Sequence, residues 1–327
     1  MVPCVTNQDQ SPITELLPLD DMVLPFQVEG IGVRGRITRL STLVNEVMTR
    51  HDYPEPVAIL LGEALTLVAL LGTALKFEGR LTLQTKSDGP LSMLVADFDS
   101  PGKLRGYAHI NRDAVIAAME AGLESPADLM GKGYLALTID QGADMDRYQG
   151  IVQLGAGGLT DAAHEYFAQS EQIATRVHLA VGPLYERDDD GEMSVSWRAG
   201  AIMIQHLPEE GGLTGFREPE DERSLSDAER GWEHATILLG TLTDAELMDP
   251  ELGADRLLYR LYHEDGVRVY TPHSVAFGCR CSRDRIEGVL RTFDEGDLDH
   301  MTVDGHIETK CEFCAQMYEF DPADLRG

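Results

Sequence analysis

Four cysteines near the C-terminus are the residues whose type and spacing most clearly indicate chemistry. They form two pairs, Cys-Arg-Cys and Cys-Glu-Phe-Cys, separated by 29 residues. Zn²⁺ takes four ligands in a tetrahedron, and two thiolates at short spacing supply half of such a site. The pattern therefore predicts one zinc ion per chain, with an iron–sulfur cluster as the competing occupant. The expected ligands are Cys279, Cys281, Cys311 and Cys314.

Two histidines, His300 and His306, lie between the cysteine pairs. Because four thiolates complete a tetrahedral shell, we expect both histidines to be surface residues and not ligands. A site made of thiolates alone carries net negative charge, which cations close in sequence could offset if they are not simply exposed to solvent. These cations are Arg280, Arg283, Arg285 and Lys310.

The first cysteine pair has an unusual spacing, because structural zinc sites normally separate their cysteines by two or more residues. On oxidation, cysteines this close in sequence could pair with each other and leave the metal without ligands. The residues alone leave two interpretations open, an inert structural zinc site and an oxidation-sensitive switch.

The region that carries the cysteines is too small to be stable without an additional stabilising element such as a metal ion. A domain of about fifty residues buries little surface, whereas a structural zinc ion supplies on the order of 10–16 kcal/mol of folding free energy. Loss of the thiolates should therefore unfold the tail. The short, charged helices expected just before it would then lose their packing partner, and any apolar face that they cover would be exposed.

The composition limits the partners of the chain. It has 327 residues, 43% of them hydrophobic, and a formal net charge of −29. Such an acidic surface repels nucleic-acid phosphates and anionic lipid heads, so we expect neither nucleic acid nor membrane as a main partner. The first twenty residues lack the pattern of a secretory signal, and the clustering of four of five cysteines fits a reducing cytoplasm. The fifth, Cys4, is expected to be a bystander thiol.

The patterns of the remaining chain predict an α+β protein whose core is a mixed, mainly antiparallel sheet with packed helices. We expect a leader over residues 1–21, the core over 22–207, a linker with helices over 208–269, and a small C-terminal zinc-binding domain over 270–327. In the core, the patterns predict a strand over 26–40, a helix capped by Ser41, and a helix over 114–130.

Residues 57–75 form an apolar stretch nearly long enough to cross a membrane. The stretch contains Glu63, Gly62 and Gly72 and has no basic flanks, so it favours a central helix buried on most sides. A helix this apolar is also a candidate for the surface that a client or partner contacts.

No motif of a familiar enzyme class occurs. GxxxxGK[ST], GxSxG and HExxH are absent, and the CEFC pair does not follow the strand–helix pattern of a dithiol oxidoreductase. We therefore expect no catalytic residues and no enzymatic activity. The alternative function is a zinc-ribbon interaction or nucleic-acid-binding protein with an inert zinc site, but the tail lacks the basic face that nucleic acid requires. Its acids include Asp294, Glu295, Asp297 and Asp299.

A series of short motifs gives the sequence a family resemblance from about residue 28 to residue 321. In order, they are VRG at 33–35, HDYPEPV at 51–57, LLGEAL at 60–65, LKFEG at 75–79, DGP at 88–90, RYQGIV at 147–152, YFAQSEQIATR at 166–176, LYRLYHE at 258–264 and the CxC…CxxC tail. With this order of motifs the sequence resembles the redox-regulated molecular chaperones of the 33 kDa chaperonin, or heat shock protein 33, family.

The resemblance implies a cytoplasmic holdase that works without ATP and binds unfolded or oxidatively damaged client proteins. In the family, the reduced, zinc-bound form is inactive. Oxidation forms two disulfides, releases zinc, unfolds the tail and linker, and favours a homodimer. Carried over to this sequence, the resemblance implies the pairs Cys279–Cys281 and Cys311–Cys314. The sequence departs from the family pattern in its leader with Cys4 and in the Gly- and acid-rich stretch 211–222.

Overall fold

The computed structural model describes residues 20–74, 78–142, 147–187, 191–207 and 227–325. Cys4, nearly all of the leader and the Gly- and acid-rich stretch 211–222 lie outside the described residues. The fold is α+β with mainly antiparallel sheets, as the sequence predicts, and the core contains two six-stranded sheets.

The first sheet, sheet A, brings the two ends of the core sequence together. Its strands run in the order β10-β1-β2-β9-β8, β11 also pairs with β1, and all pairs are antiparallel. They are β1 (Met22–Val28), β2 (Val33–Leu40), β8 (Thr175–Arg187), β9 (Met193–His206), β10 (Val267–Val269) and β11 (His273–Ser274). The strand predicted over 26–40 is therefore a hairpin, and Gly32 at φ 60° makes the reversal that other residues rarely adopt.

The second sheet, sheet B, has the order β12-β5-β4-β3-β6-β7. Its strands are β3 (Arg80–Ser87), β4 (Leu91–Asp99), β5 (Lys103–Ile110), β6 (Gly133–Asp140), β7 (Tyr148–Gln153) and β12 (Ala276–Phe277). All neighbours are antiparallel except β12, which runs parallel to β5. Residues 267–278, which we call the connecting segment, thus pair first with sheet A and then with sheet B.

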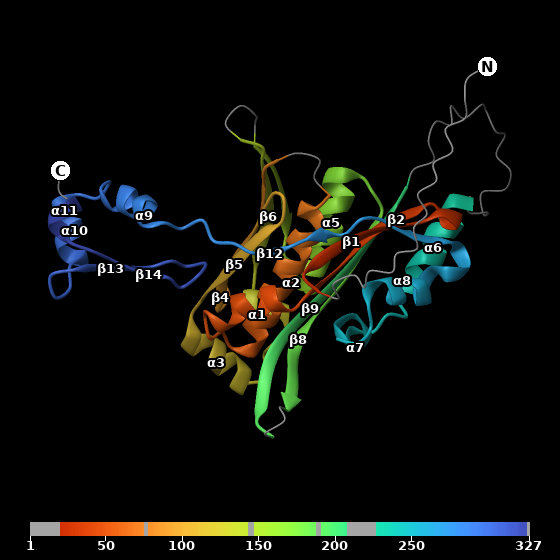
Figure 1. Cartoon of the computed structure of the whole chain (residues 1–327), viewed down its shortest axis with the longest axis horizontal. Helices are drawn as coiled ribbons and strands as arrows, with labels where there is room; N and C mark the ends of the chain where they lie inside the picture. Colours follow the sequence, from red (N-terminus) through yellow and green to blue (C-terminus); the bar gives the residue numbers. More distant parts are fainter. Residues whose placement is uncertain (1–19, 75–77, 143–146, 188–190, 208–226, 326–327) are drawn as a thin grey trace, which may run out of the picture.

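The long apolar helix α2 (Glu55–Gly72) lies between the two sheets (Figure 1). Its two glycines explain how both sheets approach so closely. A Cβ on Gly62 would lie 2.6 Å from Val181 of sheet A, and one on Gly72 would lie 2.2 Å from Phe98 of sheet B. Of the apolar window of this helix, 83% is buried inside the protein, so the prediction of a central core helix is confirmed. Most of its surface is not open to a partner in this state.

Glu63 is the carboxylate of α2 whose ionisation depends most on the fold. Burial, reinforced by the charge of Asp244 in the region after the core, raises its pKa from 4.5 to about 7. The folded protein therefore binds a proton more tightly than the unfolded chain does. The stability that this proton contributes is complete below pH 4.5 and is lost as the pH rises through 7.

Glu63→Gln is accordingly expected to raise the free energy of unfolding at pH 8 by about 1–3 kcal/mol, because glutamine cannot ionise. The gain should shrink towards pH 5, where the wild-type carboxyl is mostly protonated. Urea unfolding at both pH values measures the difference, and Glu55→Gln on the exposed first turn of α2 is the control. A gain that does not change between pH 5 and pH 8 would contradict this account of Glu63.

The remaining core helices differ in detail from the sequence prediction. Helix α1 (Thr42–Thr49) begins after Ser41, but the Ser41 side chain does not cap it. The carboxylate of Asp21 accepts hydrogen bonds from the first amides of the helix instead, at 3.1–3.2 Å. The single helix expected over 114–130 is two, α3 (Arg112–Glu120) and α4 (Pro126–Met130), because a Ser125 capping box starts a new helix. Helix α5 (Gly158–Tyr166) completes the core.

The described part of the linker region, from residue 227 on, forms three α-helices on the outer face of sheet A, the face away from α2. They are α6 (Asp227–Leu239), α7 (Asp244–Met248) and α8 (Ala254–Tyr262). The linker helices and sheet A share one apolar cluster. The sheet contributes Leu24, Phe26, Val28, Val33, Ile37, Ala180, Ile202 and Ile204, and the helices contribute residues that include Leu239, Leu247, Leu257, Leu258 and Tyr262. The rings of Phe26 and Tyr262 stack with their centroids 6.1 Å apart.

The linker helices do not pack where the sequence suggested. Their packing partner is sheet A and not the cysteine tail, which extends from the opposite end of the core (Figure 1). The connecting segment runs between these two ends. Polar contacts add to the docking of the linker, since Arg198 Nε donates to the Met248 carbonyl at 2.8 Å and Arg39 donates to the Asp249 carbonyl.

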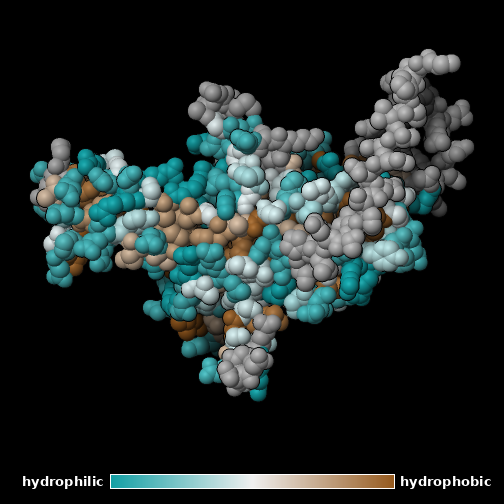
Figure 2. All heavy atoms as spheres, viewed as in Figure 1, coloured by the Kyte–Doolittle hydropathy of each residue, from teal (hydrophilic) through white to brown (hydrophobic). Residues whose placement is uncertain are grey.

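The tail has a small core of its own. Its elements are α9 (Arg283–Leu290), α10 (Glu295–Met301), the hairpin of β13 (Ile307–Lys310) and β14 (Met317–Phe320), and α11 (Pro322–Leu325). The fully packed apolar residues are Leu290, Leu298, Ile307, Phe320 and Leu325. Hydrophilic residues cover most of the face seen in Figure 2, including much of the tail. The tail therefore has little hydrophobic burial to stabilise it.

Candidate metal centre

The four predicted cysteines come together at the base of the tail. Their Sγ atoms all lie within 4.8 Å of one another, and the four form a group able to hold a metal ion. Cys279 lies 3.4 Å from Cys281 and 3.7 Å from Cys311, and Cys281 lies 3.3 Å from Cys314. A tetrahedral ion with bonds of about 2.3 Å places its sulfur ligands ~3.8 Å apart, so the site needs only small shifts of the sulfurs, with these three pairs moving slightly apart.

Each cysteine pair is positioned by its local backbone. The first pair follows β12, where the Gly278 amide donates to the Leu104 carbonyl at 2.9 Å, and it ends where Ser282 caps α9. The second pair occupies the turn between β13 and β14. There the Cys311 amide donates to the Gln316 carbonyl at 3.0 Å, and Ala315 has a positive φ of 57°. The end of a strand and a tight turn thus bring the four thiols together.

The pKa values of Cys279, Cys311 and Cys314 are shifted from their ordinary value. Burial raises the pKa of Cys311 and of Cys314. Burial acts in the same direction on Cys279, but hydrogen bonds with Cys281 outweigh it and lower the pKa of Cys279. A metal ion that binds all four sulfurs must therefore displace protons from Cys311 and Cys314, whose pKa values are raised, and its binding couples to pH.

His300 and His306 lie outside the cluster, as expected. His306 Nδ1 pairs with Glu319 at 3.2 Å. The cations close in sequence have varied roles. Arg280 pairs with core carboxylates, and the guanidinium of Arg283 lies 4.5 Å from the ring centroid of Phe320. Arg280 and Arg283 thus have partners other than the thiolates, so offsetting the negative charge of the cysteine cluster is only part of the role of these cations.

Residues of the core that the sequence did not single out contact the cysteine pairs. Arg50 Nη1 donates to the Cys314 carbonyl, and His51 Nε2 lies at hydrogen-bond distance from the Phe313 carbonyl, both at 3.1 Å. Phe313, between Cys311 and Cys314, packs edge-on against Tyr107 with centroids 4.7 Å apart. His51 opens the HDYPEPV motif, but nothing in that motif shows what the histidine contacts.

One further core residue, Arg105, contacts both pairs. Its Nη1 lies 3.9 Å from Cys279 Sγ, and its guanidinium lies 3.6 Å from the ring centroid of Phe313. The cation therefore faces a sulfur of the first pair and the aromatic ring inside the second. A sequence pattern cannot show this, because Arg105 lies 174 residues from Cys279.

Comparison with known proteins gives a consistent result. A family model described as "Hsp33 protein" matches residues 21–321. The chain is 42% identical over 316 residues to a 33 kDa chaperonin of Caulobacter vibrioides, covering 95% of this chain and 99% of the relative. It is 38% identical over 310 residues to a 33 kDa chaperonin of Azotobacter vinelandii, covering 93% of each. The solved structure of the 33 kDa chaperonin from Thermotoga maritima is similar with a TM-score of 0.71 and 25% identity, covering 93% of this chain and 96% of that one.

Proposed function

The chain belongs to the Hsp33 family of chaperones, and we propose that it is a redox-regulated holdase that works without ATP in the cytoplasm. Its partners are unfolded or oxidatively damaged client proteins, whose aggregation it prevents. In the reduced form, Cys279, Cys281, Cys311 and Cys314 hold one zinc ion per chain, and the chaperone is inactive. The protein catalyses no reaction on its clients.

The observation that carries the proposal is the position of the linker helices. Helices α6–α8 cover the apolar outer face of sheet A and are joined by the connecting segment to the first cysteine pair. The covered face includes Phe26, Val33, Ile37 and Ile202, all at most 2% exposed. An apolar face of this kind binds unfolded chains through the same hydrophobic effect that now binds the linker helices.

Oxidation is the proposed trigger. Each molecule of hydrogen peroxide takes two electrons from a pair of thiolates, whose sulfurs join as a disulfide. The peroxide O–O bond breaks, and its two oxygens take up two protons from the solvent and leave as two waters. The resemblance to the family assigns the pairs as Cys279–Cys281 and Cys311–Cys314. Cys281 Sγ lies as close to Cys314 Sγ, at 3.3 Å, as to Cys279 Sγ, at 3.4 Å, so the geometry does not select a pairing and the pairs rest on the family alone. Zinc, left without thiolate ligands, is released.

Loss of zinc removes the main stabilising contribution of the tail. The tail buries five apolar side chains fully, which is far too few to offset the conformational entropy of about fifty residues. Unfolding then proceeds along the connecting segment. Its strands β12, β11 and β10 are two or three residues long and lie at sheet edges, so little holds them once the tail is free.

Release of β10 removes packing contacts of the linker helices directly. Val267 and Val269 of β10 pack against the same apolar cluster as α8. We propose that α8 and α6 then leave sheet A and that the exposed face binds clients and favours a homodimer. The alternative, an inert zinc ribbon that binds nucleic acid, is disfavoured by the formal net charge of −29.

A client-aggregation experiment tests the proposal. Light scattering of a chemically denatured client is expected to stay low with protein treated with peroxide under mild unfolding stress, and to rise as in buffer with reduced, zinc-bound protein. Reducing the treated protein and restoring zinc should return the inactive state. Equal protection by the reduced and oxidised forms would refute redox control.

A further inference from the structure

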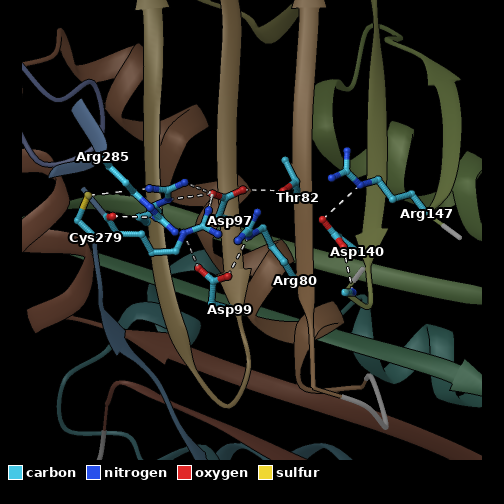
Figure 3. A network of polar contacts seen from close by, with 11 residues as sticks. Arg80, Thr82, Asp97, Asp99, Asp140, Arg147, Cys279 and Arg285 are labelled. Atoms are coloured by element: carbon cyan, nitrogen blue, oxygen red, sulfur yellow. Dashed lines mark hydrogen bonds and ion pairs between the residues drawn. The ribbon is translucent and has the colours of Figure 1, made fainter. Parts of the chain in front are cut away.

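The contacts between the tail and sheet B converge on one buried carboxylate, Asp97 of β4. Asp97 is 3% exposed. Its Oδ1 accepts a hydrogen bond from Thr82 Oγ1 at 2.6 Å, and its Oδ2 lies 2.7 Å from Arg105 Nη2 and 2.8 Å from Arg280 Nη2. Figure 3 shows Asp97 between Thr82 on one side and the tail with Cys279 on the other. Burying a carboxylate this deeply is costly unless cations and hydrogen-bond donors pair with it, as they do here.

Arg280 comes from the tail side of this contact. It is the residue between the first two cysteines, and its Nε also pairs with Asp99 Oδ2 at 3.1 Å. Its carbonyl accepts a hydrogen bond from Arg285 Nη1 at 3.0 Å, which holds it against the start of α9. Arg280, which lies between Cys279 and Cys281, thus pairs with two carboxylates of the core, Asp97 and Asp99.

Arg105 comes from the core side. Its Nε and Nη2 both bind Asp97 Oδ2, at 2.8 and 2.7 Å, so its position is set by β4. From there the same guanidinium reaches Cys279 and lies over Phe313, as described above. One cation of sheet B therefore connects the buried carboxylate to both cysteine pairs.

We infer that Asp97, Arg105 and Arg280 form a latch that docks the reduced tail on sheet B, with Arg105 as the positioning residue for both cysteine pairs. The inference rests on the proposed redox function and assigns its core-side regulation. While the latch is closed, the core covers part of the cysteine cluster and limits the approach of an oxidant. The latch is a second restraint on the inactive state, at the opposite end of the core from the linker helices.

The latch and the metal are separable, because zinc coordination contributes far more free energy than charge-assisted hydrogen bonds do. A variant without the latch should therefore keep its zinc until an oxidant arrives. Arg105→Gln is expected to retain about one zinc per chain when reduced. Under peroxide it should release that zinc about tenfold faster than wild type, which corresponds to ~1.4 kcal/mol of lost docking energy.

The experiment follows zinc release with a colorimetric chelator and measures hydrogen exchange of residues 276–278 in the reduced protein. Arg105→Gln should accelerate both, and Arg280→Gln should do the same from the tail side. Arg147→Gln is the matched control, because Arg147 pairs with Asp140 Oδ2 of sheet B at 3.3 Å, away from Asp97 and Asp99 (Figure 3), and it is expected to leave both rates unchanged. Arg105→Lys keeps the charge and should restore part of the slow release.

Several outcomes would overturn the latch. Release and exchange rates of Arg105→Gln equal to those of wild type would do so, as would equal acceleration by Arg147→Gln. A general loss of core stability is recognised by urea unfolding of the oxidised proteins. There the tail is already undocked, so Arg280→Gln should match wild type, whereas Arg105→Gln also removes a partner of the buried Asp97 and should lower the stability of the core. If wild type itself keeps its zinc under peroxide, the proposed function fails. Hydrogen exchange of residues 276–278 in the reduced variants then still tests whether the latch exists.

Discussion

Cys311→Ser protein is expected to bind almost no zinc and to lose the fold of residues 279–325. A serine hydroxyl stays protonated at neutral pH and does not replace a thiolate, so three ligands remain for a tetrahedral ion. Zinc in such sites contributes on the order of 10–16 kcal/mol of folding free energy, and the five buried apolar residues of the tail cannot compensate for its loss. This is the largest effect of a single substitution that we expect in the chain.

Metal analysis of the purified, reduced protein measures this effect, together with hydrogen exchange across the tail. Wild type should contain about one zinc per chain. Cys4→Ser is the control, because Cys4 lies outside the two closely spaced cysteine pairs of the sequence and is expected to be a bystander thiol, so this variant should keep its metal. A Cys311→Ser protein with a full zinc content and a protected tail would show that the site has been assigned wrongly.

Leu258→Asp is expected to make the chaperone active without any oxidant. Leu258 of α8 is fully buried against sheet A. Removal of a buried leucine alone costs about 2–5 kcal/mol, and a carboxylate in its place adds the cost of burying an unpaired charge. The linker helix should therefore leave the sheet even though zinc remains bound and the tail stays folded.

The neighbouring residue provides a matched control. Tyr259 is 63% exposed on the same turn of α8, so Tyr259→Asp adds the same charge without disturbing the apolar cluster. Reduced Leu258→Asp should suppress the aggregation of a denatured client, and reduced Tyr259→Asp should not. If reduced Leu258→Asp is as inactive as reduced wild type, then the covered face of sheet A does not bind clients.

The sequence predicts the parts of this protein that depend on local patterns. The clustered cysteines, a buried helix within 57–75 and the α+β class with mainly antiparallel sheets are visible in residue spacing. All three are present in the structure, where the helix is α2 (Glu55–Gly72). The family resemblance is confirmed by the match over residues 21–321. The disulfide pairing and the domain boundaries remain predictions.

Contacts between distant segments explain what the sequence does not predict. The cap of α1 comes from Asp21 and not from the adjacent Ser41, because a folded chain brings a better acceptor to the same amides. The linker helices have the amphipathic pattern expected, but a helical pattern does not show which surface it packs on. Arg105 is an ordinary strand residue in the sequence, and only the pairing of β4 with β5 places it beside Asp97 and the cysteine cluster.

The coupling between the two ends of the molecule is the central claim, and one time-resolved experiment tests it. After peroxide is added to the reduced protein, zinc release and hydrogen exchange of helices α6–α8 are followed in the same sample. We expect the tail to lose protection as zinc leaves, and α8 and α6 to lose protection next, while β3, β4 and β6 of sheet B stay protected. Complete zinc release with α6–α8 still protected would contradict the claim that the metal site controls the linker.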